Sequence, residues 1–110
     1  MKLSADAEQI DFVNTAHNTG IKKVFFSGLE VNSALTQFAC GFLSAGETIE
    51  KHAHATMEEF FYFLDGNGEY LLDSVTIRVH KGVSVRIPAG TAHELRAEED
   101  LHFIFFGIAV

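Results

Sequence analysis

The chain has 110 residues, a length that fits one domain with a single hydrophobic core. Its net charge of −7 argues against binding to a nucleic-acid backbone, which needs clustered lysine and arginine. No run of apolar residues approaches the roughly 20 that span a bilayer. Residues 1–6 contain no apolar signal core, and Cys40 is the only cysteine. We therefore expect a cytoplasmic protein without disulfides.

The chain begins with weak helical periodicity over residues 5–13, and we treat residues 1–20 as an N-terminal extension of a single domain. From residue 21 onward, short strand-like segments alternate with turn residues, a pattern typical of an all-β sandwich or barrel. Strands are predicted at 21–26, 35–43, 47–53, 58–64, 69–72, 75–79, 83–87, 93–97 and 101–108. So many short strands indicate a closed or double-sheet antiparallel fold. The 11 phenylalanines fit its interior.

Turn signals separate these strands. The strongest is Asp65-Gly66-Asn67-Gly68, with two X-Gly pairs in succession. Pro88-Ala89-Gly90 must also turn, because proline lacks the N–H that a sheet ladder needs. These two turns flank the segments that carry the ionisable residues discussed next.

Two histidines one residue apart, His52 and His54, stand out as candidate metal ligands. Because alternate residues of a strand share a face, Glu50, His52 and His54 are predicted to line one side. A lone H-x-H pair is a weak signal, since surface histidines take this spacing by chance. A carboxylate nearby and His93 further along the chain strengthen the interpretation as a metal site. Imidazole and carboxylate together form open, catalytic-type metal sites.

The carboxylate stands on the following aromatic strand. There Glu59, Phe61 and Phe63 share one face, and Glu58 is predicted to point outward. If the Glu59 face is interior, Phe61 and Phe63 make the pocket largely apolar. Burying ionisable groups in such a wall is costly unless they are compensated, and a divalent cation would compensate imidazoles and a carboxylate together.

Two longer motifs contain these residues. The stretch Gly46-x5-His52-x-His54-x4-Glu59-x6-Gly66 resembles the first motif of the cupins, and Gly82-x5-Pro88-x-Gly90-x2-His93 resembles the second. The resemblance covers residues 46–97 directly. It implies a double-stranded β-helix, the jelly-roll barrel of the cupins. It also implies one divalent transition metal inside the barrel, held by the histidines and glutamate of the motifs: His52, His54, Glu59 and His93.

The resemblance carries two further expectations. Cupins commonly form homodimers by exchanging terminal strands, so residues 1–20 can take part in a dimer contact. The second motif usually ends in asparagine, and this chain has Ala97 there. That asparagine is not a metal ligand in the family pattern, so the predicted site survives and its pocket becomes slightly more apolar.

The other candidate residues are expected to have structural or surface roles. Three histidines without ligand-like neighbours, His17, His80 and His102, are expected to be exposed or hydrogen-bonded. Cys40 is expected to be a small core residue. Arginine at positions 86 and 96 could anchor a substrate carboxylate if it pointed inward, although a surface position is expected for both.

Two hypotheses for function remain open. The first is a small-molecule enzyme, dioxygenase-like or isomerase-like, with Fe, Mn, Ni, Cu or Zn as Lewis acid. Glu59 and Glu50 are its candidate catalytic residues, although Glu50 could equally sit in water at the barrel mouth. The resemblance is compatible with quercetinase-like, acireductone-type or sugar-isomerase activity and favours none. The second hypothesis is a non-catalytic module that binds or senses a metal or small ligand.

Overall fold

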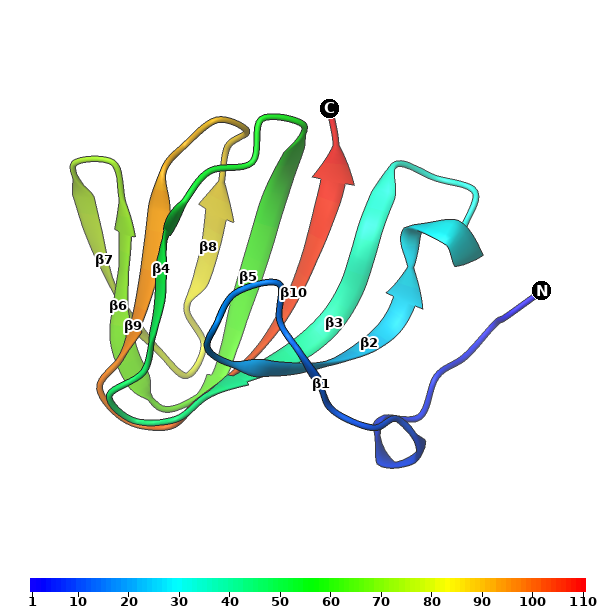
Figure 1. Ribbon diagram of the computed structural model, residues 1–110, viewed down its shortest axis with the longest axis horizontal. Helices are drawn as coiled ribbons and strands as arrows, with labels where there is room; N and C mark the ends of the chain where they lie inside the picture. The colour runs from blue at the N-terminus through cyan, green and yellow to red at the C-terminus, as the bar shows by residue number, and fades with distance from the viewer.

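The computed structural model describes residues 1–110 and contains two antiparallel sheets that face each other (Figure 1). The six-stranded sheet has the order β1-β2-β3-β10-β5-β8, and the four-stranded sheet has the order β4-β9-β6-β7. The strands are β1 (Val13–Asn14), β2 (Ile21–Ser27), β3 (Leu35–Leu43), β4 (Thr48–His52), β5 (Met57–Asp65), β6 (Asn67–Leu72), β7 (Val75–His80), β8 (Ser84–Ile87), β9 (His93–Ala97) and β10 (Leu101–Ala109). The predicted all-β jelly-roll barrel is confirmed.

Helix is limited to two 3₁₀ turns, η1 (Ala7–Gln9) and η2 (Gly28–Glu30). No helix has the length and apolar character that crossing a membrane requires. The helical interpretation of residues 5–13 is therefore wrong beyond one turn. The side chain of Asp6 caps η1 by accepting a hydrogen bond from the backbone N–H of Glu8, but η1 buries no residue. A single turn without a buried face gains nothing from packing, and packing is what stabilises short helices.

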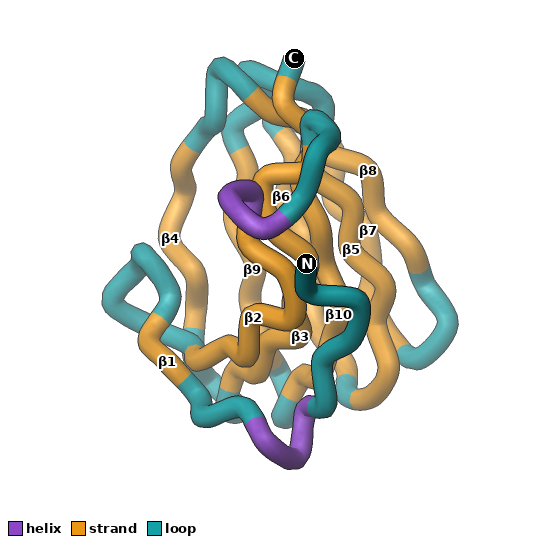
Figure 2. Tube along the Cα trace, turned by 90° about the vertical axis from the view of Figure 1, so that its right-hand side faces the viewer, coloured by secondary structure: helices purple, strands orange, loops and turns teal.

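The nine predicted strands all form, and β3 and β9 have the predicted bounds. A tenth strand, β1, was missed because it is only two residues long. It pairs with β2 and brings the loop after it to the side of the barrel beside β4, where the Thr19 hydroxyl donates a hydrogen bond to the Thr48 carbonyl at 2.6 Å (Figure 2). Residues 13–20 thus contribute to the barrel wall.

The core lies between the sheets and follows from alternation along β5 and β10, where every second residue from Glu59 to Phe63 and from Leu101 to Gly107 is buried. The most enclosed side chains are Phe63, Leu43, Leu95 and Leu101, each 0–1% exposed. Five aromatic rings pack against one another near the centre, some stacked and some edge-to-face or tilted: Phe61, Phe63, Tyr70, Phe103 and Phe105. The large phenylalanine content is explained in part by this cluster, because each ring buries about 150–250 Å².

The turn at Gly66 joins the two sheets and does not close a hairpin. Strand β5 pairs with β10 and β8, whereas β6 pairs with β7 and β9. Gly66 has φ of +91°, and a Cβ there would clash with the carbonyl oxygen of Asp100. Only glycine fits this crossing, which explains its place at the end of the first motif.

Candidate metal centre

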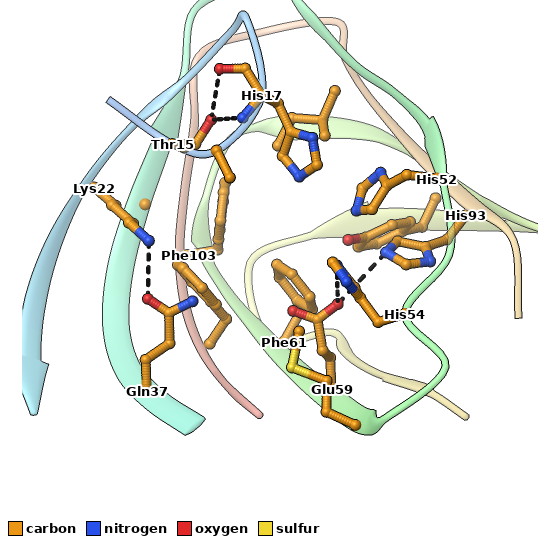
Figure 3. A pocket seen from close by; sticks show the side chains of 16 residues that line it. Thr15, His17, Lys22, Gln37, His52, His54, Glu59, Phe61, His93 and Phe103 are labelled. Atoms are coloured by element: carbon orange, nitrogen blue, oxygen red, sulfur yellow. Dashed lines mark hydrogen bonds and ion pairs between the residues drawn. The ribbon is translucent and has the colours of Figure 1, made fainter. Parts of the chain in front are cut away.

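Four side chains from both sheets converge at one end of the barrel interior (Figure 3). His52 ends β4, His54 lies in the loop after it, Glu59 lies on β5, and His93 begins β9. Each offers one ligand atom, and these atoms all lie within 4.8 Å of one another. Such a spread is small enough for one ion to contact all four, so this cluster could hold a metal ion.

Backbone carbonyls orient two of the imidazoles. The Nδ1 atom of His52 lies 2.8 Å from the carbonyl oxygen of Glu50, and Nδ1 of His93 lies 2.9 Å from that of Thr91. A carbonyl can only accept, so each Nδ1 must carry the proton. The Nε2 lone pairs are then free for a metal. This arrangement, in which the second ring nitrogen donates to an outer partner, is the usual one for ligating histidines.

Burial makes the cluster costly without a cation. Glu59 is 7% exposed and His93 is 2% exposed. The Nε2 atom of His93 is buried and has no hydrogen-bond partner. It lies 3.4 Å from Oε1 of Glu59, and Nε2 of His54 lies 3.6 Å from the same oxygen. An unpaired buried nitrogen costs about 1–3 kcal/mol. A divalent ion would satisfy this atom and the carboxylate together, so the residues fit such an ion.

The electrostatics of the centre favour a neutral imidazole at His52. Burial lowers the pKa of His52, and the nearby imidazoles of His93, His17 and His54 act in the same direction, while the hydrogen bond to the Glu50 carbonyl opposes them. The neutral form is the one that ligates a metal.

Glu50 does not share the ligand face, and the prediction that it does is wrong. Ile49 pairs with Leu95 and His52 pairs with His93, so β4 carries one residue more than β9 between these pairs. This bulge resets the alternation of the strand. Ile49, 8% exposed, and His52 therefore both line the cavity, whereas the Glu50 side chain points to solvent. Glu50 contributes only its carbonyl.

The aromatic strand behaves largely as predicted. Glu59, Phe61 and Phe63 share the buried face of β5, while Glu58 points outward and pairs with Arg86 at 2.6 Å. Phe61 lines the cavity beside the cluster. Phe63 is fully buried in the core and does not line it, so its predicted pocket role is corrected.

The cavity in front of the cluster has a volume of about 100 Å³. Its floor is aromatic, with Phe61, Tyr70, Phe103 and Phe105 in the lining. Burial raises the pKa of Tyr70 well above its ordinary value, and the Glu59 carboxylate adds to this effect. Tyr70 therefore stays a neutral phenol at physiological pH. The floor thus carries no charge of its own.

His17 also lies at the site, which its sequence neighbours do not indicate. Its ring centroid lies 4.0 Å from that of His52, and it lines the cavity, so the interpretation of His17 as a residue without ligand-like neighbours is wrong. The loop is held in place by Thr15, whose Oγ1 accepts from the His17 N–H at 3.2 Å and donates to the Thr19 carbonyl at 2.7 Å. The polar turn residues signal a loop, but nothing local signals where that loop ends.

Lys22 and Gln37 were also missed. They stand on β2 and β3, at the wall opposite His52 and His93 (Figure 3). Nζ of Lys22 donates to Oε1 of Gln37 at 2.9 Å. Burial lowers the pKa of Lys22, and the negative charge of Glu59 opposes that shift.

The remaining candidates lie outside the site. Arg86 and Arg96 are exposed and pair with outward-facing carboxylates, so neither can anchor a ligand in the cavity. Cys40 is buried, as expected, but does not line the cavity. His80 is exposed, and His102 stacks on Phe42 with a ring-centroid distance of 3.9 Å outside the cavity.

Comparison with known proteins decides the family. A family model described as a cupin domain matches residues 42–108. The chain belongs to the cupin family. A curated relative is the uncharacterized protein MJ1618 of Methanocaldococcus jannaschii, which is 41% identical over 44 residues. That alignment covers 40% of this chain and 35% of MJ1618, so the chain spans about a third of the relative that it matches.

Solved structures show the same fold in proteins of diverse names. A predicted oxalate decarboxylase from Thermotoga maritima superposes with a TM-score of 0.88 at 18% identity, covering 98% of this chain and 100% of that one. Ectoine synthase from P. lautus gives 0.83 at 18%, covering 97% and 78%. The polyketide cyclase RemF from Streptomyces resistomycificus gives 0.82 at 15%, covering 98% and 80%. At these identities the likeness shows the cupin fold alone.

Proposed function

We propose that this cupin is a metal-dependent enzyme acting on a small, oxygen-containing molecule. The observation that carries the proposal is the convergence of four ligand atoms within 4.8 Å beside a cavity with an aromatic floor. The proposed ligands are the motif residues His52, His54, Glu59 and His93. The ion is Fe, Mn, Ni, Cu or Zn, since imidazole and carboxylate suit all of these.

A metal that prefers five or six ligands would keep one or two positions for substrate, and it would supply Lewis acidity there. The chain's own residues prepare the site. The carbonyls of Glu50 and Thr91 hold the rings of His52 and His93 in the ligating orientation. Phe61 and Tyr70 exclude water from the floor, which strengthens electrostatic interactions with a bound substrate.

The size of the cavity limits the substrate. A volume of about 100 Å³ corresponds to roughly seven to ten water-sized groups, because one such group needs about 10–15 Å³ in this measure. A compact acid, enediol or short sugar derivative fits this space. A flavonol is larger than this space and would have to extend past His17 into the neighbouring depression lined by Thr48, Lys51 and His52. The size therefore favours isomerase-like or small-acid chemistry over a quercetinase-like reaction.

The proposal is tested by metal content and turnover. Purified untagged protein should carry about one divalent metal per chain, and the double variant His52→Ala/His54→Ala should carry almost none by inductively coupled plasma mass spectrometry. Equal metal in both would refute the ligand assignment. Protein loaded separately with Fe(II), Mn(II) and Zn(II) is then given compact enediols, hydroxy acids and aldoses, with dioxygen uptake and product NMR as readouts.

A second candidate, a non-catalytic binding module, is favoured by one specific observation. With Glu50 facing solvent, Glu59 is the only carboxylate that lines the cavity. If Glu59 ligates the metal, no carboxylate remains there as a general base. A protein that binds the compact ligands tightly but converts none of them with any of the three metals would support this candidate over the enzyme.

We also propose that the protein is a homodimer, as cupins commonly are. Support comes from the outer face of the six-stranded sheet, which carries half-buried rings. Phe60 and Phe106 stack there with a centroid distance of 5.0 Å, and Phe25 and Phe38 meet edge-to-face at 5.2 Å. Apolar rings grouped on an outer sheet face are typical of subunit contacts. A second copy of the chain would cover them.

A further inference from the structure

The wall opposite the proposed ligands carries a cation and an amide. Lys22 lies on β2 and Gln37 on β3, and both line the cavity (Figure 3). Lys22 pairs with Gly41 across the β2–β3 ladder. A Cβ at Gly41 would lie 2.5 Å from the ring of Phe103, so glycine leaves the space that this aromatic floor residue occupies. The two polar side chains thus stand above an apolar floor.

Lys22 is not matched by a carboxylate. Its ammonium donates one hydrogen bond, to Oε1 of Gln37 at 2.9 Å, and forms no ion pair. By contrast, Arg78 and Arg86 on the outer surface each pair with glutamate. An ammonium has three donors, so two remain for a ligand in the cavity. A half-buried cation with no carboxylate in direct contact is costly, and a bound anion reduces that cost.

The hydrogen bond from Lys22 also fixes Gln37. An ammonium can only donate, so the amide atom that faces it must be the oxygen. The amide nitrogen of Gln37 is then turned away from Lys22, and it has no hydrogen-bond partner within the protein. The pair together offers several N–H donors from two side chains, an arrangement that suits the oxygens of a carboxylate.

The charge of the cavity points to the same ligand class. Its ionisable lining consists of Lys22, Glu59 and four histidines. The charges of Lys22 and Glu59 cancel, and ligating histidines are neutral, so a divalent ion would bring the formal charge to about +2. A substrate with two negative charges would balance it. The chain as a whole has a net charge of −7, so a metal-loaded cavity would be positive within an acidic protein.

We propose that Lys22 and Gln37 form a carboxylate-binding subsite, so that the cavity takes a compact dianionic acid with one end at the metal ligands and the other at this pair. The inference rests on the proposed function, because the metal supplies the second anchor. Lys22 and Gln37 here determine which ligand binds and how it is oriented, and the reaction itself is left open.

The test compares two probes of equal size with Zn(II)-loaded protein. Succinate carries two carboxylates, and succinamate replaces one of them by a neutral amide. Wild-type protein should bind succinate about 10–100-fold more tightly by isothermal titration calorimetry, since hydrogen bonds to charged groups dominate the difference. Lys22→Met should reduce this ratio to near one while keeping about one zinc per chain, and Lys22→Arg should retain most of it.

Lys23→Met is the matched control. Lys23 is the next residue of β2, and it contacts the Phe12 ring and the Ala7 carbonyl away from the cavity. Its loss should leave the ratio at the wild-type value. A metal-loaded wild type that binds succinate no better than succinamate, or binds neither, overturns this inference alone, as does an unchanged ratio in a folded Lys22→Met. A wild type that holds no metal overturns the proposed function and this inference with it.

Discussion

Replacement of His93 by leucine should separate the cost of the buried imidazole from its use as a ligand. In metal-free protein, His93→Leu removes an unpaired buried nitrogen, a gain of about 1–3 kcal/mol. It also removes the hydrogen bond to the Thr91 carbonyl, a loss of about 0.5–1.5 kcal/mol. The two terms partly offset, so the free energy of unfolding should rise by about 1 kcal/mol, and by no more than about 2.5 kcal/mol. Leu95→Ala, a fully buried control on the same strand, should cost about 2–5 kcal/mol.

Adding metal should make the wild type clearly more stable than His93→Leu. Zinc at 100 times its dissociation constant stabilises the wild type by about 2.7 kcal/mol. For a domain of this size that corresponds to a rise in melting temperature of about 10–20 °C. His93→Leu should gain far less, whereas His80→Leu, at an exposed histidine, should respond like the wild type. Urea and thermal denaturation with and without zinc measure both effects. An equal zinc response in His93→Leu, or a metal-free loss comparable to that of Leu95→Ala, would refute the reasoning.

Three other outcomes are expected. Because burial lowers the pKa of His52, the unfolded chain takes up a proton near pH 6.5 before the folded chain does. The free energy of unfolding of the metal-free protein, measured in urea, should therefore be highest at pH 7.5 and fall toward pH 5.5. The variant His52→Asn should show a smaller fall. Gly41→Ala should lower the free energy of unfolding by about 1–3 kcal/mol, because the added methyl group crowds the Phe103 ring. A variant as stable as the wild type in urea denaturation would argue against that contact. Phe106→Lys on the outer sheet face should convert a dimer into monomers by sedimentation velocity, and an unchanged dimer would place the subunit contact elsewhere.

The sequence predicted the strands and the ligand cluster because both depend on short-range signals. Alternation along 101–108 and 58–64 is regular, so the buried faces of β10 and β5 could be assigned from period alone. The glycines and Pro88 mark the turns between strands and recur at the spacing of the two motifs. His93 was the one ligand distant in sequence, and the motif resemblance supplied it.

Alternation failed at Glu50 for a physical reason. It assumes an unbroken ladder, and the bulge between Ile49 and His52 adds a residue that no propensity marks. The cavity residues His17, Lys22 and Gln37 escaped for another reason. Their roles depend on which segments face one another across the barrel, since they meet the ligands of the other sheet only in the folded chain. Without that information, a lysine in a strand is expected to lie on the protein surface.

These two differences from the sequence-based expectation change the charge of the cavity. The bulge turns Glu50 away and leaves Glu59 as the only acidic side chain in the cavity, while the β2–β3 pairing adds the ammonium of Lys22. The interior therefore gains a cation and loses an anion relative to the sequence-based expectation. With the metal the balance becomes positive, which favours an anionic ligand and disfavours an acid–base mechanism that needs a second carboxylate. Reversing the balance with Lys22→Glu should then abolish succinate binding while the four metal ligands stay intact.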